Sequence, residues 1–288
     1  MAWFSVVAQG CLIGGLYALF AVGLSLTFGI MRLVNIAHGD LITLAAFLAL
    51  IVAETLGLYP LATLVIVVPV MFALGYGLQR GVLNRTLGES ILPPLLVTFG
   101  MSIVIQNALL EVFGADTHRL VVGSLETASL TLPGGVAIGV FPLIIFLVAV
   151  AIIGGLQLMF YRTDIGRAFR ATSDDPVTVE LMGADNRHLY GLAMAIALAV
   201  TAFAGVFLAV RTNFDPSIGP SRLIYAFEAI IIGGLGNLWG TLAVAVIVGI
   251  AQSIGAAIKP DLQILAGHVA FLIVLAVRPN GLFPRMRD

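Results

Sequence analysis

Apolar segments long enough, or nearly long enough, to cross a bilayer alternate with short polar connections along the chain. A spanning helix needs about 20 mostly apolar residues. A transmembrane β-strand needs only about 10 residues, with an alternation that these segments lack. The pattern predicts an all-α polytopic membrane helix bundle of about eight or nine spanning helices, at 4–30, 41–56, 60–79, 92–112, 137–160, 189–210, 223–235, 240–258 and 262–277.

The segment 223–235 is too short to cross the membrane alone. Its residues cover only ~20 Å at about 1.5 Å per residue, against a hydrocarbon core of ~30 Å. It ends in the glycine-rich run at Gly233, Gly234 and Gly236. Because broken helices survive in membranes only where they line a cavity or are buried in protein, we expect a broken helix near 223–245. These glycines form either a turn between two helices or a flexible break in a helix that lines a translocation path, and in the second case they are candidates for its wall or gate.

The basic residues of the polar connections orient the spans. Cytoplasmic connections of membrane proteins carry an excess of Lys and Arg. With the N-terminus outside, the inner connections hold Arg32, Arg80, Arg85, Arg162, Arg167, Arg170, Arg187, Arg278, Arg285 and Arg287, and the outer ones hold only Arg119, Arg211, Arg222 and Lys259. We therefore expect an N-terminus outside and a C-terminus in the cytoplasm, with the whole chain, 1–288, forming one transmembrane domain.

Composition narrows the class of protein. Of the 288 residues, 60% are hydrophobic and 10% are charged, and the formal net charge is -1. Soluble domains carry roughly 25% charged residues, so an ordinary soluble enzyme is excluded. The charge balance predicts no nucleic-acid partner, and the single cysteine, Cys11, excludes a multi-thiolate metal site. The only lysine, Lys259, lies outside any phosphate-binding loop motif, so the chain cannot bind nucleotide in that way.

Glycines four positions apart predict places where helix backbones approach closely. They occur as the pairs Gly10/Gly14, Gly77/Gly81, Gly135/Gly139 and Gly236/Gly240.

The longest polar connection, about 161–188, contains a predicted short helix outside the membrane. Asp175 is a helix N-cap followed by Pro176 at the first helical position, and Gly183 is a stop signal. The helix, about 176–182, carries apolar side chains beside acidic ones such as Glu180. Helices that lie on lipid favour Lys and Arg on the polar face. Docking into a partner protein is therefore the better interpretation.

Polar residues near the first two spans allow two interpretations. Asn35, His38, Gly39 and Asp40 lie close together. They could form a proton relay or the start of a catalytic dyad. The structural alternative is a helix break at Gly39, with Asn35, His38 and Asp40 capping the second span.

Further polar residues lie inside the spans. Gln106 and Asn107 could contact a polar substrate or join helices. Glu228 is the clear mid-span acid, which could pair with Arg222, become protonated or face a subunit interface; His268 is the basic candidate. An ion-coupled carrier using Glu228 and an intramembrane enzyme using His38 and Asp40 therefore stay open on these residues alone.

Four motifs together resemble one family. The run from Gly23 to Gly39 resembles the N-terminal signature of the permease subunits of branched-chain amino acid ABC importers, the Liv type, with Ile36 where the family usually has Phe. Residues 166–171 with Asp175 and Gly183 are similar to their ATPase-contacting loop. Residues 226–237 match their late glycine motif, and 278–283 resemble their C-terminal R-P-x-G-L-F.

The resemblance implies a function and a set of partners. Such a chain is a transport subunit and not an enzyme, works in the inner membrane amid lipid, and needs no cofactor or metal of its own. Its partners would be two cytoplasmic ATPase subunits, a second homologous permease and a periplasmic or lipid-anchored binding protein. An alternative within the family is transport of urea or short amides. The ATPase-coupling residues would be Gly166, Arg167, Ala168, Arg170, Asp175, Pro176, Glu180 and Gly183.

Overall fold

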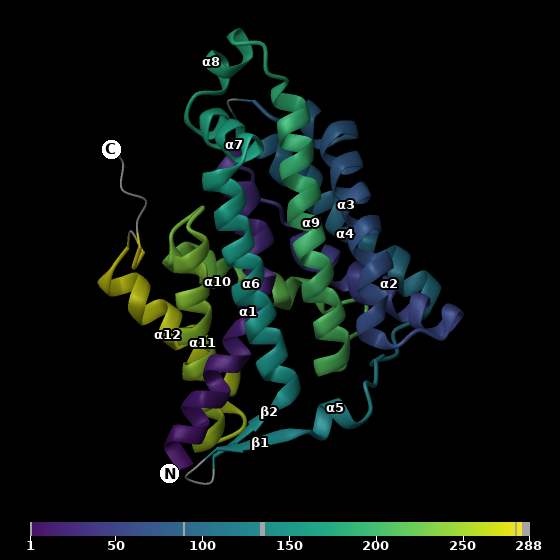
Figure 1. Ribbon diagram of the computed structural model, residues 1–288, viewed down its shortest axis with the longest axis vertical. Coiled ribbons are helices and arrows are strands. Elements are labelled where there is room, and N and C mark those ends of the chain that lie inside the picture. The colour runs from purple at the N-terminus through teal and green to yellow at the C-terminus, as the bar shows by residue number, and fades with distance from the viewer. Residues whose placement is uncertain (1, 89, 133–135, 280, 284–288) are drawn as a thin grey trace.

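The fold is a bundle of long helices with one short hairpin and a compact helical cap at one end (Figure 1). The computed structural model describes residues 2–88, 90–132, 136–279 and 281–283. The long helices are α1 (Ala2–Met31), α2 (His38–Leu56), α3 (Leu64–Gly81), α4 (Leu92–Phe113), α6 (Val140–Arg162), α9 (Asn186–Arg211) and α11 (Leu238–Ile258). The shorter ones are α5 (Ser124–Thr127), α7 (Asp164–Asp174), α8 (Pro176–Leu181), α10 (Gly219–Gly233) and α12 (Leu262–Val277), with 3-10 turns at Pro60–Thr63 and Leu83–Arg85.

Seven described helices are long and apolar enough to cross a membrane. They match seven of the predicted spans, and the predicted fold class is confirmed. The two remaining predicted spans are the shorter helices α10 and α12. Helix α6 begins at Val140 rather than near 137, because the preceding residues form β2 (Val136–Gly139), which pairs antiparallel with β1 (Ser129–Leu132).

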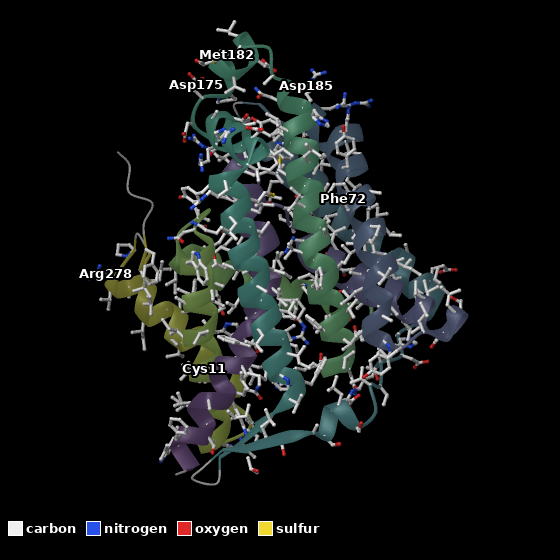
Figure 2. All side chains as sticks on the ribbon, viewed as in Figure 1. Cys11, Phe72, Asp175, Met182, Asp185 and Arg278 are labelled. Carbon is white, nitrogen blue, oxygen red and sulfur yellow. The ribbon has the colours of Figure 1, made fainter. Side chains whose placement is uncertain are left out.

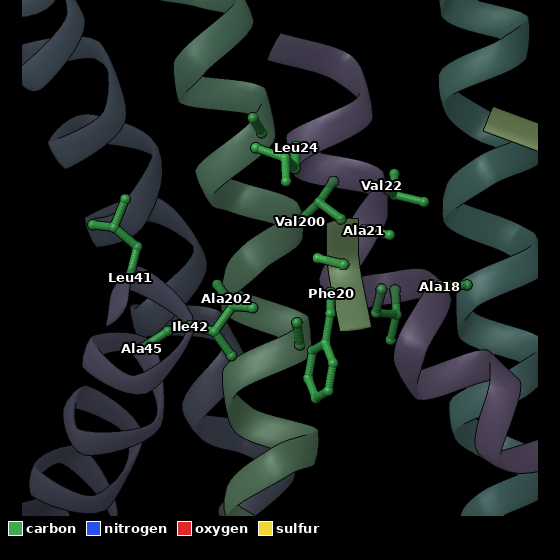
Figure 3. Close-up of a cluster of buried hydrophobic side chains, with 14 of the residues drawn as sticks. Ala18, Phe20, Ala21, Val22, Leu24, Leu41, Ile42, Ala45, Val200 and Ala202 are labelled. Atoms are coloured by element: carbon green, nitrogen blue, oxygen red, sulfur yellow. The ribbon is translucent and has the colours of Figure 1, made fainter. Parts of the chain in front are cut away.

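Helices α1 and α9 are the most buried of the seven and form the centre of the bundle. Aromatic and aliphatic side chains from α1, α2 and α9, among them Phe20, Ile42 and Val200, pack into one core (Figure 3). In helices α3, α4 and α6 most apolar side chains are exposed or only partly buried, and lipid or another subunit would cover them.

Glycines bring α1 and α11 into backbone contact. A Cβ added at Gly10 would lie 2.5 Å from the Cα of Ile250, and one added at Gly14 would lie 2.5 Å from the Cα of Val246. The pair Gly10/Gly14 therefore confirms the expectation of close packing. The pair Gly77/Gly81 does not, because no described heavy atom lies within 4 Å of a Cβ there. Gly135 lies outside the described residues.

Helix α2 begins deep inside the bundle. Nε2 of His38 donates to the carbonyl of Phe20, near the middle of α1, at 2.8 Å. The predicted caps are wrong: the N-cap residue is Ala37, and no side chain caps this helix end. Gly39 instead lies against the start of α10, where an added Cβ would come within 2.0 Å of the Gly219 carbonyl. The first turns of α2 and α10 thus meet at an interior level of the bundle.

Residues of three motifs, 23–39, 226–237 and 278–283, meet at the turn between α10 and α11. Gly234 and Gly236 have φ values of +89° and +83°, a region that favours glycine. Gly29 of α1 packs directly on Gly236. The C-terminal segment folds back here, and the backbone N–H of Leu282 donates to the carbonyl of Ile232 at 2.7 Å.

Candidate functional site

Helix α7 is clamped to the end of α6. The Thr163 hydroxyl caps α7 by accepting from the N–H of Gly166 at 3.1 Å. A Cβ added at Gly166 would lie 2.2 Å from the Met159 carbonyl, so only glycine permits this approach. The Arg170 guanidinium donates to the Phe160 carbonyl at 2.6 Å and lies 4.8 Å from the centroid of the Tyr161 ring.

The opposite face of α7 contacts the centre of the bundle. Phe169 is fully buried, and the Ser173 hydroxyl donates to the Gly29 carbonyl at 2.6 Å. Ala168 is partly buried and packs against the core. Because Gly29 also contacts Gly236, a displacement of α7 would be felt at the end of α1 and at the turn between α10 and α11.

Helix α8 is a rigid, capped turn held by its neighbours. The carboxylate of Asp175 accepts from the N–H groups of Val177 and Thr178, both at 3.1 Å, and from the Thr178 hydroxyl. These hydrogen bonds, the one from the Thr178 side chain first, lower the pKa of Asp175 below its usual value. Pro176 opens the helix, and its carbonyl accepts from the Asn186 side chain at 2.7 Å.

The end of α8 presents an apolar surface away from the bundle. Gly183, with φ of +88°, turns the chain after the helix. Leu181 and Met182 are more than four-fifths exposed, at 84% and 83%. Figure 2 places Asp175, Met182 and Asp185 at the end of the molecule opposite the N-terminus. We call Val177, Leu181 and Met182, all exposed, the α8 tip.

Charged side chains of α7 and α8 are also exposed. Arg167 forms an ion pair with Asp164, one turn earlier in α7. Glu180 lies on α8 beside Leu181 and is exposed. Exposed apolar side chains next to an exposed acid have the character of a protein-docking surface. The predicted coupling residues therefore divide into those that position the segment, Gly166, Ala168 and Arg170, and those at its exposed end.

A cavity of about 330 Å³ lies beneath α7. Residues of α1, α6 and α7 and of the turn between α10 and α11 line it, including Gly29, Arg170, Gly236 and Asn237. Residues of α7 and one of the predicted gate glycines, Gly236, thus line the same cavity.

The predicted path residues lie at several places. Asn35 and His38 are buried, and the Oδ1 atom of Asn35 has no partner among the described residues. Gln106 donates to the buried carboxylate of Asp40 at 2.9 Å, which joins α4 to the start of α2. Asn107, by contrast, is exposed and donates to the Ile103 carbonyl of its own helix at 2.8 Å.

Glu228 and the gate glycines lie on α10 and at its end. Nδ1 of His268, on α12, donates to the carboxylate of Glu228. The sequence allowed Glu228 to pair with Arg222, to become protonated or to face a subunit interface. The structure pairs it with His268 instead of Arg222. Gly233 packs against Gly240 of α11, where an added Cβ would meet backbone at 2.6 Å. Sequence reasoning missed the Glu228–His268 pair, the Asp40–Gln106 bond and the Ser173–Gly29 bond, because each joins residues with no local pattern in common.

Comparisons with known proteins identify the family of the chain. Residues 6–277 match the model of a family described as the permease component of branched-chain amino acid transport systems. The chain belongs to this family. It is therefore a multi-pass membrane protein and a transport subunit of the ABC type rather than an enzyme.

Several members of the family are similar over nearly the whole chain. The permease BraD of Pseudomonas aeruginosa, from a high-affinity branched-chain amino acid transport system, is 28% identical over 97% of this chain and 95% of its own length. LivH of Escherichia coli K12 is 26% identical over 96% and 94%. A probable LivH of Methanocaldococcus jannaschii is 25% identical over 86% and 80%. No solved structure matches the chain significantly.

Proposed function

We propose that this chain is the permease subunit of an ATP-driven importer that moves branched-chain amino acids across the inner membrane. The α8 tip carries the proposal: it is a capped, rigid helix with an exposed apolar end, tied through α7 to α1 and the glycine turn. The likeness to BraD and LivH over nearly the full length supports the substrate class.

The proposed partners follow from what the chain lacks and what it exposes. Its sequence has no phosphate-binding loop, so ATP hydrolysis is assigned to two cytoplasmic ATPase subunits that bind the α8 tip. A second homologous permease would cover the exposed apolar faces of the bundle. A periplasmic or lipid-anchored binding protein would deliver the amino acid at the other end.

In the proposed cycle, closure of the ATPases pushes on the α8 tip. Helix α7 transmits the push because Gly166, Arg170 and Ser173 hold it on α6 and α1. Gly29, which contacts both Ser173 and Gly236, carries the movement to the turn between α10 and α11, and the cavity lined by Gly236 provides space there. The membrane path then opens alternately to the two sides.

The deciding experiment is reconstitution in vesicles. We expect L-leucine to accumulate against its gradient only when the chain, its co-encoded subunits, ATP and the binding protein are all present. Gly183→Pro should abolish accumulation and the co-purification of the ATPases, because proline cannot adopt the positive φ of Gly183. Accumulation driven by the chain alone, or by a proton gradient without the ATPases, would refute the proposal.

A further inference from the structure

Four helices contribute polar side chains to one buried cluster around α10. Helix α1 provides Tyr17, α10 provides three residues, α11 provides Gln252 and α12 provides His268. We call this group the α10 cluster: Tyr17, Arg222, Tyr225, Glu228, Gln252 and His268.

A stack of three rings forms the middle of the α10 cluster. The rings of Tyr17 and Tyr225 stack with centroids 4.8 Å apart, and those of Tyr225 and His268 stack at 5.9 Å. The Tyr17 hydroxyl donates to Oε1 of Gln252 at 2.6 Å, and His268 donates to Oε1 of Glu228. One hydrogen-bonded and stacked unit therefore joins α1, α10, α11 and α12.

Three side chains of the α10 cluster each have a polar atom without a hydrogen-bond partner among the described residues. Among the described residues, six buried side-chain nitrogen or oxygen atoms have no hydrogen-bond partner that meets the distance and angle limits, and three of them belong here: Nε of Arg222, Nε2 of Gln252 and Oε2 of Glu228. Gln252 still acts on the Tyr225 hydroxyl, and Asp215 acts on Arg222 without forming an ion pair with it in the described part of the chain. Since an unpaired buried polar group costs about 1–3 kcal/mol, three in one cluster direct the search for a bound polar molecule to this place.

The three atoms match the hydrogen-bonding groups of an amino acid. Two of them donate, from Arg222 and Gln252, and one accepts, on Glu228. The α-carboxylate of a zwitterion needs donors, and its α-ammonium needs an acceptor. Arg222 and Glu228 lie six residues apart on α10, ~9 Å along its axis, with Tyr225 between them, so one zwitterion reaches both only when the two side chains turn toward each other.

The charges around the rings favour the same orientation. Arg222 and Glu228 both act electrostatically on the phenol of Tyr225. Arg211, at the end of α9, adds a second cation that acts on Tyr17. Arg222 and Arg211 thus supply positive charge near the two tyrosines, and the acceptor, Glu228, already receives one hydrogen bond from His268.

We propose that the α10 cluster is a transient binding site for the substrate zwitterion on its way through the permease. Arg222 and Gln252 hold the α-carboxylate, and Glu228 holds the α-ammonium. The inference rests on the proposed function and assigns it a substrate site. The stacked rings fill the space in this structure, so binding requires Tyr225 to separate from Tyr17 or His268. Helix α12 can allow this, because Gly267 is its only buried residue in the described structure.

The test compares three small molecules that differ in one charged group. L-Leucine has both charges, leucinamide lacks the carboxylate, and 4-methyl-2-oxopentanoate lacks the ammonium. Equilibrium binding of each is measured to the full-length chain in nanodiscs, with the subunits that co-purify and without a binding protein. In the unsubstituted protein, each analogue should bind about tenfold or more weakly than L-leucine.

Each variant should then lose the ability to recognise one charged group of the ligand, the α-ammonium or the α-carboxylate. Glu228→Gln should weaken L-leucine binding about tenfold and leave 4-methyl-2-oxopentanoate unchanged. Arg222→Gln should weaken the binding of L-leucine similarly and leave the binding of leucinamide unchanged. If Arg222→Gln fails to fold, Arg222→Lys replaces it, because lysine keeps the charge but lacks the Nε donor. The exposed Glu111→Gln and Arg85→Gln are the matched controls and should change none of the three.

Two results would overturn the site. In the first, either variant weakens the binding of all three molecules equally, which would mean that the α10 cluster has a structural role. In the second, the unsubstituted chain shows no saturable binding of L-leucine. Both outcomes are separate from failure of the proposed function. That function is tested by whether uptake requires the ATPases, and uptake could remain ATP-driven with Glu228 and Arg222 replaced.

Discussion

Gly166 controls how closely α7 packs on α6. An added methyl group would lie 2.2 Å from the Met159 carbonyl and 2.5 Å from the Cα of Phe160, so the backbones must separate. We expect Gly166→Ala to lower the free energy of unfolding by about 1–3 kcal/mol and to reduce uptake strongly. Thermal unfolding in detergent and L-leucine uptake in vesicles measure the two effects.

Gly155, on α6, provides the control for that substitution. No described heavy atom lies within 4 Å of a Cβ added there. Gly155→Ala should leave both unfolding and uptake unchanged. Equal effects of the two substitutions would mean that α6 is sensitive to any added methyl group rather than to the contact with α7.

Asp175 tests whether the cap of α8 matters for coupling. Its pKa is lowered by the hydrogen bonds from Thr178 and Val177, so the cap is complete above the ordinary Asp pKa of about 3.9 and is lost as the pH falls through the lowered value. We expect Asp175→Asn, which accepts the same amide hydrogens, to keep uptake. Asp175→Ala should fray α8 and lower uptake.

Hydrogen exchange at the amides of Val177 and Thr178 measures the cap directly. Protection should be constant from neutral pH down to about pH 5 and should fall in Asp175→Ala. The neighbouring exposed Asp174, which accepts no capping bond to α8, provides the control variant Asp174→Ala. If Asp175→Ala keeps full protection and uptake, α8 does not need its cap.

Helix α8 is the element on which the proposed docking of the ATPases depends. Leu181 is 84% exposed, so Leu181→Asp removes apolar contact area from an interface without disturbing the core. We expect normal expression and unfolding temperature, together with loss of ATPase co-purification and of uptake. Val121, 68% exposed in the connection before α5, provides the control: Val121→Asp should retain the ATPases.

The elements show what a sequence can predict in this class of protein. The span expected at 92–112 is α4, Leu92–Phe113, and the helix expected at 176–182 is α8, Pro176–Leu181. Both follow from local rules, since apolar length defines a span and Asp-Pro defines a helix start. The spans, the short α10 and the likeness of four motifs to one family could therefore be predicted.

The rest depends on contacts between distant residues. His268 pairs with Glu228 across forty positions, and the segment before 140 forms a strand because a second strand lies beside it. The start of α2 is fixed by Phe20 and Gly219 rather than by its own side chains. Neither hydropathy nor spacing carries such information.

At the scale of the whole molecule, the orientation in the membrane is the main expectation left to test. In a Cys11→Ala background, Leu130→Cys on β1 and Glu180→Cys on α8 place single thiols at opposite ends of the bundle (Figure 1). With the N-terminus outside, an impermeant maleimide should label Leu130→Cys in intact spheroplasts. It should label Glu180→Cys only after permeabilisation. The reverse pattern would contradict the expected orientation.

The brevity of α10 has a consequence for how the protein is made. A segment of fifteen residues that carries Arg222 and Glu228 cannot partition into lipid by itself as it leaves the translocon. Its acid finds His268 only after another forty residues have been synthesised. Biogenesis must therefore hold α10 at the protein-lined exit until α11 and α12 emerge, so about the last quarter of the polypeptide inserts as a single unit.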